Sequence, residues 1–312
     1  MDLKVSQVDD VTERVRMIRF VHAGGGHLPG YTPGAHLDFD LGDAGTRSYS
    51  LVDFTPPGKI PDAYRIAVQV EPEGTGGSRA MHDLATGDTV EATAPKNSFE
   101  LHEGDAPALL IAGGIGVTPM ISFATELARR GTPFGFHFAA RSRDVCAFHA
   151  ELAEQHGDGL TFWFDDTTRI DVETLLREAP EGAHVYCCGP KGMIEAVRHA
   201  AEAAGLPSDR VRFELFETPQ ADGDGFEVEI NDGRVFTVPP GRSIIEVLED
   251  AGLDLMYDCQ RGDCGICQTD VLDGVPDHRD VVLSDAERAA GDVMQICVSR
   301  AKTPRLKLDI DG

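Results

Sequence analysis

Four cysteines near the end of the chain constrain its fold and chemistry more than any other feature. They are Cys259, Cys264, Cys267 and Cys297. The spacing C-x4-C-x2-C with a distant fourth cysteine is the ligand pattern of a [2Fe–2S] cluster. Thiolates are soft, anionic ligands for iron, while Gly262 and Gly265 let the backbone wrap closely and direct N–H groups at the sulfurs. We therefore expect these four residues to hold a [2Fe–2S] cluster.

Two other uses of such a cysteine cluster are a structural zinc site and a set of buried free thiols. Zinc loops more often begin with C-x2-C and lack a glycine-containing x4 turn, so the spacing favours the iron–sulfur interpretation. The chain has seven cysteines, and outside the cluster we expect Cys146 and Cys187 to be small buried hydrophobic side chains. An odd number of cysteines, four of them crowded together, favours metal ligation over a disulfide framework.

The acidic balance of the chain excludes several classes of partner. Its 312 residues include 53 Asp and Glu against 28 Lys and Arg, a formal net charge of −25. This charge repels phosphate backbones and anionic membrane surfaces, so we expect no nucleic-acid and no membrane partner. The most apolar window, residues 106–124, is interrupted by glycines and a proline, and the N-terminal residues lack an export-type apolar stretch. We expect a cytoplasmic protein without a membrane segment.

The length and the turn pattern divide the chain into three modules. Residues 1–102 alternate short β-type runs with turn residues, which is typical of an antiparallel barrel. Residues 103–217 alternate apolar strands with amphipathic helices, the pattern of βαβ units around a parallel sheet. Residues 218–225 are polar and without apolar periodicity, so we expect a linker there, followed by a third module over residues 226–312.

Periodicity locates the expected elements within these modules. The barrel strands are expected over residues 11–21, 35–41, 48–52, 64–70 and 89–94. The strands of the parallel sheet are expected over residues 108–112, 134–139, 160–164, 184–188 and 211–215, with helices over 121–130, 147–156, 172–178 and 193–204. In the third module we expect a hairpin around Asn231, capping boxes at Ser243 and Ser284, and a last strand over residues 305–310.

The barrel contains residues suited to a flat ring and a phosphate. On one expected strand these are Arg47, Ser48, Tyr49 and Ser50, and on a later turn they are Gly76, Gly77 and Ser78. Arginine offers a fork for a phosphate, tyrosine a flat face for an aromatic ring, and serine a short hydrogen-bond donor. A glycine-rich turn before a helix can cradle a phosphate. Taken singly, the strand and the turn are more often plain structural features.

Two glycine-containing loops in the parallel-sheet module suit a pyridine nucleotide. The first carries Gly113, Gly114, Gly116, Thr118 and Pro119, and the second carries Cys188, Gly189 and Pro190. Glycines let the backbone approach a pyrophosphate, and a helix N-terminus favours its negative charge. Because both loops follow parallel strands, they share the carboxyl edge of the sheet and should face each other. Arg141 follows the second strand and can meet the adenosine half, but Asp144 would repel a further phosphate, so NADH is favoured over NADPH.

Together the modules resemble known redox families. R-x-Y-S followed by G-G-S is similar to the flavin barrel of the ferredoxin-reductase family, and G-G-x-G-x-T-P with C-G-P is similar to its nicotinamide-nucleotide loops. The cysteine segment resembles a plant-type ferredoxin, whose family fold is a β-grasp. In this order the three modules resemble the phthalate dioxygenase reductase family, which includes vanillate O-demethylase reductases. The fold implied is an antiparallel flavin-binding β-barrel, a parallel α/β nucleotide-binding domain and a β-grasp ferredoxin domain.

The family resemblance also implies roles for single residues. Reductases whose ferredoxin domain is C-terminal are FMN enzymes, so FMN is expected rather than FAD. Ser50 would lie near flavin N5, and Thr118 and Cys188 beside the nicotinamide. The other residues of the strand and turn would contact the flavin and its phosphate. Thr75 stands where related reductases often place an arginine, which leaves the phosphate partly to neighbouring arginines and backbone N–H groups.

The implied activity is that of the reductase component of a multicomponent oxygenase. NADH would pass a hydride to FMN, which would reduce the cluster one electron at a time, because the cluster accepts only single electrons. The expected acceptor is a Rieske-type non-haem iron oxygenase or O-demethylase for an aromatic compound such as vanillate or phthalate. Its docking face should be basic, because residues 222–312 carry 20 Asp or Glu against 9 Lys or Arg. Alternatives are a cytochrome P450, carnitine-type oxygenase or desaturase as acceptor, or a non-catalytic redox carrier or sensor.

Overall fold

The computed structural model describes residues 1–56, 58, 60–216 and 221–312, so the expected linker residues 218–220 lie outside the described residues. The chain forms two compact units. The first comprises Met1–Gly189 with Ala204–Arg212, and the second comprises Pro190–Ala203 with Phe213–Gly312.

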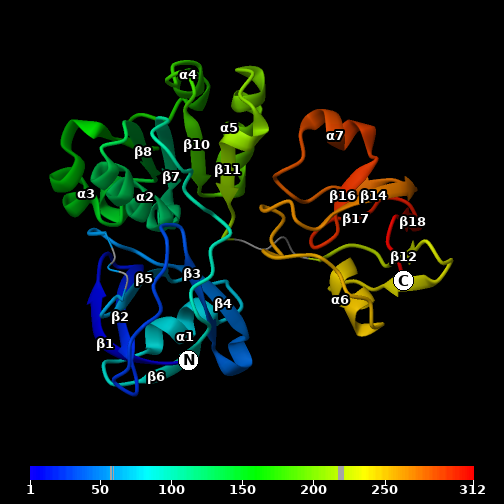
Figure 1. Ribbon diagram of the computed structural model, residues 1–312, viewed down its shortest axis with the longest axis horizontal. Coiled ribbons are helices and arrows are strands. Elements are labelled where there is room, and N and C mark those ends of the chain that lie inside the picture. Colours follow the sequence, from blue (N-terminus) through cyan, green and yellow to red (C-terminus); the bar gives the residue numbers. More distant parts are fainter. Residues whose placement is uncertain (57, 59, 217–220) are drawn as a thin grey trace. The chain divides into compact units, whose positions relative to one another are not determined.

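The first part of unit one is a six-stranded antiparallel sheet (Figure 1). Its strands are β1 (Asp2–Asp10), β2 (Val15–His22), β3 (His36–Asp40), β4 (Thr46–Ser50), β5 (Tyr64–Gln69) and β6 (Thr89–Ala92). The order is β4-β3-β6-β1-β2-β5, and a bridge between Leu51 and Ile66 brings the two edge strands together. Helix α1 (Gly77–Asp83) follows β5. The barrel predicted from the turn pattern is confirmed.

Two details of the barrel differ from the expectation. Strand β1 was not among the strands named from the sequence, and its Leu3 and Val5 side chains are fully buried in the barrel core. The strand expected from residue 11 begins only at Val15. A turn precedes it, in which the Thr12 hydroxyl accepts hydrogen bonds from the backbone N–H groups of Arg14 and Val15.

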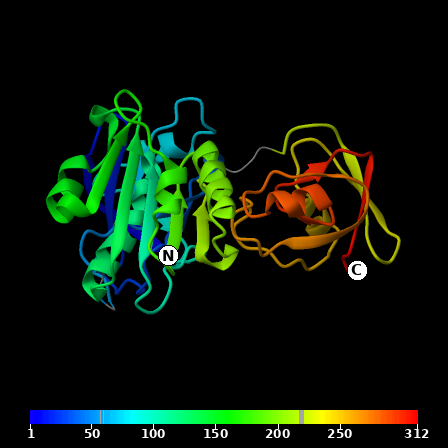
Figure 2. The same ribbon diagram turned by 90° about the horizontal axis from the view of Figure 1, so that it is seen from above.

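The second sheet is parallel and five-stranded, in the order β11-β10-β7-β8-β9 (Figures 1 and 2). Its strands are β7 (Ala108–Gly113), β8 (Phe134–Ala140), β9 (Leu160–Phe164), β10 (His184–Cys188) and β11 (Val211–Glu214). The helices between them are α2 (Val117–Arg130), α3 (His149–His156), α4 (Val172–Arg177) and α5 (Lys191–Ala203). Every strand and helix expected in this module is present.

The barrel and the parallel sheet share one hydrophobic core inside unit one. Val52 and Ala67 from the barrel side and Phe99 from the connection between the two sheets are buried in the same cluster as α2. The ring of Phe99 lies 5.1 Å from that of Phe123 and 5.9 Å from that of Tyr186. This continuous packing explains why the two folds form a single compact unit.

Unit two contains a five-stranded mixed sheet in the order β13-β12-β18-β14-β16. Its strands are β12 (Phe226–Glu229), β13 (Val235–Val238), β14 (Gln268–Asp273), β16 (Val293–Gln295) and β18 (Arg305–Leu308), with the short pair β15 (Pro276–Asp277) and β17 (Arg300–Ala301). Both predicted capping boxes are confirmed: Ser243 caps α6 (Ile244–Asp250) and Ser284 caps α7 (Asp285–Ala290). The predicted hairpin is β12 and β13.

Candidate cofactor sites

The two nucleotide-type loops meet at the point where the strand order of the parallel sheet reverses. Strand β7 pairs with β8 on one side and with β10 on the other, so the chain leaves β7 and β10 in opposite directions across the sheet. Ligands bind at the carboxyl ends of such neighbouring strands. Gly113 ends β7 and Cys188 ends β10. A Cβ on Gly116 would lie 2.2 Å from the Cys188 carbonyl oxygen, so the predicted facing of the loops is confirmed.

The remaining residues of this edge are placed as follows. Thr118, in the first turn of α2, is 2% exposed and its hydroxyl donates to the Ile115 carbonyl at 3.0 Å. Pro119 is buried in the same turn. Pro190 follows Gly189 and its carbonyl accepts the Met193 N–H at the start of α5. These loops offer backbone N–H groups and a helix start to a pyrophosphate.

Arg141 and the cysteines of the sheet differ in their access to solvent. Arg141 is exposed just beyond the end of β8. Cys187 is fully buried, and burial raises the pKa of its thiol. Burial also raises the pKa of the Cys146 thiol, to about 12. The prediction that Cys146 and Cys187 are buried small side chains is confirmed.

The strand and the turn predicted for the flavin contact each other through Arg47. Its guanidinium donates to the Thr75 hydroxyl at 2.7 Å, and a Cβ on Gly77 would lie 2.6 Å from its Cγ. Gly76 directly precedes α1 and has φ of +102°, a backbone conformation in which a residue with a side chain would be strained. Arg47 therefore lies over the glycine turn, where the resemblance places the phosphate.

The other side chains of β4 become less exposed toward the end of the strand. Ser48 is exposed and donates to the Asp38 carboxylate at 2.5 Å. Tyr49 is half-buried, 5.9 Å from the Phe39 ring, and burial raises the pKa of its phenol to about 12. Ser50 is 5% exposed. The strand thus holds Ser50 inside the protein and leaves part of the Tyr49 ring face accessible.

The glycine turn is also fixed by its own side chains. The Ser78 hydroxyl accepts the Glu71 N–H at 3.0 Å. Arg79 donates to the carbonyls of Pro72 at 2.7 Å and Gly74 at 3.4 Å. Arg79 thus contacts only carbonyl groups of its own loop, whereas Arg47 reaches from β4 across Gly77 to Thr75, so a phosphate at this turn would meet Arg47 and the backbone N–H groups.

Helix α2 connects the flavin-type strand to the nucleotide-type loop within unit one. The Ser122 hydroxyl donates to the Leu51 carbonyl at 2.8 Å and accepts the Asp53 N–H at 3.2 Å. The Thr125 hydroxyl donates to the Asp53 carbonyl at 2.8 Å. These bonds are buried, so they fix the chain just after Ser50 to the helix that begins beside Gly116. These hydrogen bonds could not be predicted from the sequence, because a Ser or Thr on an apolar helix has no local pattern that indicates a distant partner.

The four cysteines of the predicted cluster come together in unit two. Cys259 is hydrogen-bonded to Cys264 and Cys297, and Cys267 to Cys297. The bonds from Cys264 and Cys297 lower the pKa of the Cys259 thiol, which favours the thiolate that iron needs.

The contacts among the cysteines connect all four thiols. Cys259 contacts Cys264 and Cys297, and Cys297 also contacts Cys267. A [2Fe–2S] cluster is held by four cysteine thiolates. The four residues therefore fit a [2Fe–2S] cluster as its ligands.

The loop that carries the first three cysteines packs closely on its own fold. Gly262 has φ of +82°, and a Cβ there would lie 2.7 Å from the Val298 side chain and 2.9 Å from Asp280 Cα. The Gly262 carbonyl accepts the Val281 N–H at 2.9 Å. Only glycine fits this position, as the sequence predicted for a tightly wrapped loop.

Comparison with known protein families supports the class of protein that these sites define. The family described as "Oxidoreductase NAD-binding domain" matches residues 110–199. The family described as "2Fe-2S iron-sulfur cluster binding domain" matches residues 228–302. The chain is therefore an iron–sulfur oxidoreductase with a nicotinamide-nucleotide domain.

Relatives over the full length define the family. The chain is 44% identical over 290 residues to the phenoxybenzoate dioxygenase subunit beta of Ectopseudomonas oleovorans, covering 91% of this chain and 89% of that one. It is 39% identical over 319 residues to the vanillate O-demethylase oxidoreductase of Pseudomonas sp. (strain HR199 / DSM 7063), covering 99% and 100%. The structure of phthalate dioxygenase reductase, described as modular for electron transfer from pyridine nucleotides to [2Fe–2S], matches with a TM-score of 0.72, 32% identity and coverage of 99% and 98%.

The chain belongs to the phthalate dioxygenase reductase family, which confirms the resemblance predicted from its motifs. It is an oxidoreductase, the reductase component of a multicomponent oxygenase. Among the described residues, no helix combines the length and apolar character needed to cross a bilayer.

Proposed function

We propose that this protein takes electrons from NADH and passes them through FMN and a [2Fe–2S] cluster to a partner oxygenase. The observation that carries the proposal is the presence of three separate sites in one chain. A nucleotide edge lies at β7 and β10, a flavin-type strand lies at β4, and four gathered cysteines lie in unit two. Bound FMN would supply the conversion from two-electron to one-electron chemistry.

The residues of the protein act by positioning rather than by acid–base chemistry. Arg47 and the glycine turn would hold the FMN phosphate, and Tyr49 would cover the ring. Ser50 would offer its hydroxyl to flavin N5. Thr118 and Cys188 would orient the nicotinamide at the joined loops, whose relation to β4 is fixed through Ser122.

NADH is the proposed nucleotide. Arg141 could contact a further phosphate on the adenosine half, but Asp144 stands three residues on and is exposed. A carboxylate there would repel that phosphate. The proposed location is the cytoplasm, a reducing compartment in which cysteines remain available as thiolate ligands for the cluster.

The proposed acceptor is a Rieske-type oxygenase or O-demethylase for an aromatic compound, with a basic docking face. Residues 222–312 carry 20 acidic against 9 basic side chains, so the cluster lies in the most acidic part of the chain. Association with a basic face should weaken as salt screens the charges, with a Debye length of about 8 Å at physiological ionic strength. Turnover with the oxygenase that does not depend on ionic strength would contradict this docking proposal.

The experiment that tests the proposed electron path is an anaerobic titration of the purified protein with NADH. Visible absorption would follow the flavin, electron paramagnetic resonance would follow the cluster, and the released flavin would be identified. Bleaching of FMN together with a rhombic [2Fe–2S] signal supports the whole path. Flavin reduction without the cluster signal would show that the protein is a flavin reductase only. If neither NADH nor NADPH reduces the flavin, the protein would instead be a redox carrier or sensor.

A further inference from the structure

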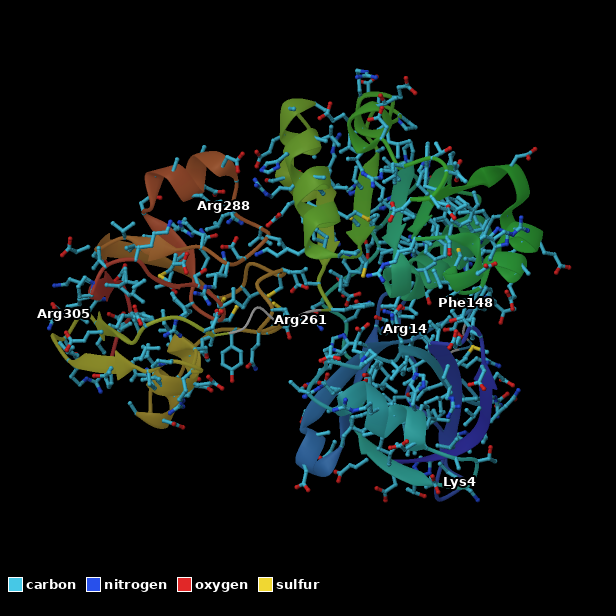
Figure 3. All side chains as sticks on the ribbon, turned by 180° about the vertical axis from the view of Figure 1, so that it is seen from behind. Lys4, Arg14, Phe148, Arg261, Arg288 and Arg305 are labelled. Carbon is cyan, nitrogen blue, oxygen red and sulfur yellow. The ribbon has the colours of Figure 1, made fainter. Side chains whose placement is uncertain are left out.

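Three charged residues join the cluster-binding loop to the end of β11 within unit two. The Leu215 N–H donates to the Asp263 carboxylate at 2.6 Å. Arg261, labelled in Figure 3, lies with its Nε 3.6 Å from the Asp263 carboxylate and its Nη2 3.8 Å from the Glu214 carboxylate. Asp263 and Arg261 belong to the loop between Cys259 and Cys264, whereas Glu214 is the last residue of β11.

These charges are withdrawn from solvent. The side chain of Glu214 is 2% exposed, that of Asp263 4% and that of Arg261 12%. Burying charged groups costs several kcal/mol per ion unless they are paired. Glu214 and Asp263 both lie beside the Arg261 guanidinium, and the Leu215 N–H donates to Asp263. These buried charges are therefore paired only while the loop stays against residues 214 and 215.

The cluster-binding loop is also held from within its own fold. The Gly262 carbonyl accepts the Val281 N–H, and Gly262 packs against Val298. On the other side, Arg261 and Asp263 contact the chain at residues 214 and 215, and Asp263 also forms a side-chain hydrogen bond with Cys259. The charged residues therefore connect a cluster ligand with the end of β11.

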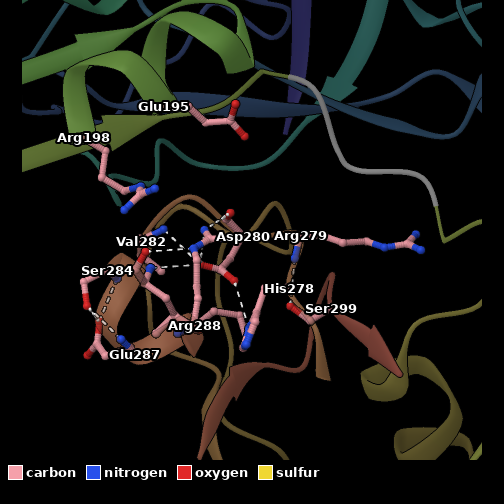
Figure 4. A network of polar contacts seen from close by, with 12 residues as sticks. Glu195, Arg198, His278, Arg279, Asp280, Val282, Ser284, Glu287, Arg288 and Ser299 are labelled. Carbon is pink, nitrogen blue, oxygen red and sulfur yellow. Dashed lines mark hydrogen bonds and ion pairs between the residues drawn. The ribbon is translucent and has the colours of Figure 1, made fainter. Parts of the chain in front are cut away.

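A second ion pair attaches another face of the ferredoxin fold. Arg198, labelled in Figure 4, belongs to α5. It donates to Asp285 at the start of α7 at 2.8 Å and to Glu202 at 2.9 Å. Its side chain is 8% exposed. The cluster-binding loop and the start of α7 are thus contacted at two separate places within unit two.

We propose that Glu214, Arg261 and Asp263 are positioning residues that hold the [2Fe–2S] loop against residues 214 and 215, and that electron transfer from the flavin to the cluster depends on this contact. The inference rests on the proposed function. It assigns the contact to the step between flavin and cluster, and not to the reduction of the flavin.

The test uses the cofactor-loaded full chain and two variants, Glu214→Gln and Asp263→Asn. Asp258→Asn is the control, because Asp258 is an exposed carboxylate directly before Cys259 and its variant loses the same charge. Stopped-flow mixing with NADH under anaerobic conditions separates bleaching of the flavin from reduction of the cluster. We expect unchanged flavin reduction and at least about tenfold slower cluster reduction in both variants, since small misplacements cost large rate factors. Asp258→Asn should behave as wild type.

Two further readouts separate positioning from damage to the cluster. The reduction potential and the paramagnetic resonance signal of Glu214→Gln should match those of wild type. Glu214 lies outside the loop that carries the cysteine ligands. If Asp263→Asn assembles no cluster, the rate of cluster reduction in Glu214→Gln still tests the inference. Wild-type cluster reduction in fully loaded Glu214→Gln overturns the inference, as does an equal slowing of flavin and cluster reduction. Failure of the wild-type protein to reduce its cluster with NADH would instead overturn the proposed function.

Discussion

The backbone carbonyl oxygen of Cys188 lies 2.2 Å from the position that a Cβ atom on Gly116 would occupy. The Cys188 carbonyl carbon is 2.5 Å and the Gly189 nitrogen 2.8 Å from the same position. Gly116 has φ of −61°, which any residue adopts, so it is contact between the loops and not backbone conformation that requires glycine here. The two nucleotide loops can approach this closely only because one of them lacks a side chain.

Replacing Gly116 with alanine should therefore weaken nucleotide binding. The methyl group would meet backbone atoms, which cannot rotate away, and the loops would have to separate. Overpacking of this kind costs about 1 to 3 kcal/mol. We expect the Kd for NADH, measured by titration of the flavin absorbance, to rise about tenfold or more while FMN stays bound.

Gly192→Ala is the matched control for that measurement. A Cβ at Gly192 in helix α5 meets nothing within 4 Å, so the same substitution adds a methyl group in open space. NADH affinity should match wild type in this variant. Equal affinities in both variants would show that the loops do not clamp the nucleotide.

Removal of the Arg47 guanidinium should release the flavin. Arg47 lies over Gly77 and donates to Thr75, so it is the side chain best placed for the FMN phosphate. A hydrogen bond to a charged group contributes about 1.5 to 3 kcal/mol, so the Kd for FMN in Arg47→Gln should rise by about one to two orders of magnitude. Arg19→Gln, which alters a barrel arginine bonded to Ser6, is the control. Unchanged FMN retention in Arg47→Gln would place the phosphate elsewhere.

The features that were predicted correctly are those that depend on residues close together in the sequence. The parallel strands were long apolar runs, and the capping boxes at Ser243 and Ser284 depend on residues three positions apart. The facing of the two nucleotide loops followed from a general rule, because parallel neighbours end at one edge. The C-x4-C-x2-C spacing of the cysteines was informative because few kinds of metal site have it.

The features that the sequence did not predict depend on contacts between distant residues. Strand β1 pairs with β2 and, far along the chain, with β6, and its Leu3 and Val5 side chains are buried in the barrel core. Asp263 bonds to Leu215 across 48 positions, and Thr125 bonds to Asp53 across 72. A polar residue in a loop or on a helix carries no local sign of such a partner. The charged attachment of the cluster loop could therefore only be found in the structure.

Replacing Cys297 with serine should remove the cluster and leave the flavin site intact. Cys297 is hydrogen-bonded to Cys259 and Cys267, so its sulfur lies among the other ligands. Iron content and the paramagnetic resonance signal should be lost, while NADH still bleaches the flavin. Cys187→Ala changes a buried thiol of the nucleotide sheet and should retain the cluster. A normal cluster signal in Cys297→Ser would remove this residue from the ligand set.

Glu126 should make the stability of unit one depend on pH. The Arg129 side chain donates two hydrogen bonds of 2.7 Å to its carboxylate and Arg130 a third, also of 2.7 Å. The hydrogen bonds from Arg129 are the main cause that lowers the pKa of Glu126 to about 2, from an ordinary value of 4.5. A carboxyl whose pKa falls on folding stabilises the folded state above its unfolded pKa and loses this contribution as the pH falls toward the folded pKa. The contribution should be complete at pH 7 and be lost between about pH 4.5 and pH 2.

Thermal or denaturant unfolding of the Glu126→Gln variant measures this contribution. At pH 7 the free energy of unfolding should drop by about 1 to 2 kcal/mol, because the arginines are partly exposed and solvent screens the pairs. The difference from wild type should shrink steadily as the pH is lowered from 5 to 3. Glu154→Gln, at an exposed position of helix α3, should show a small difference at every pH. A Glu126→Gln difference that stays constant over this range would mean that the ion pairs with Arg129 and Arg130 do not stabilise the folded state, and that the substitution acts through packing alone.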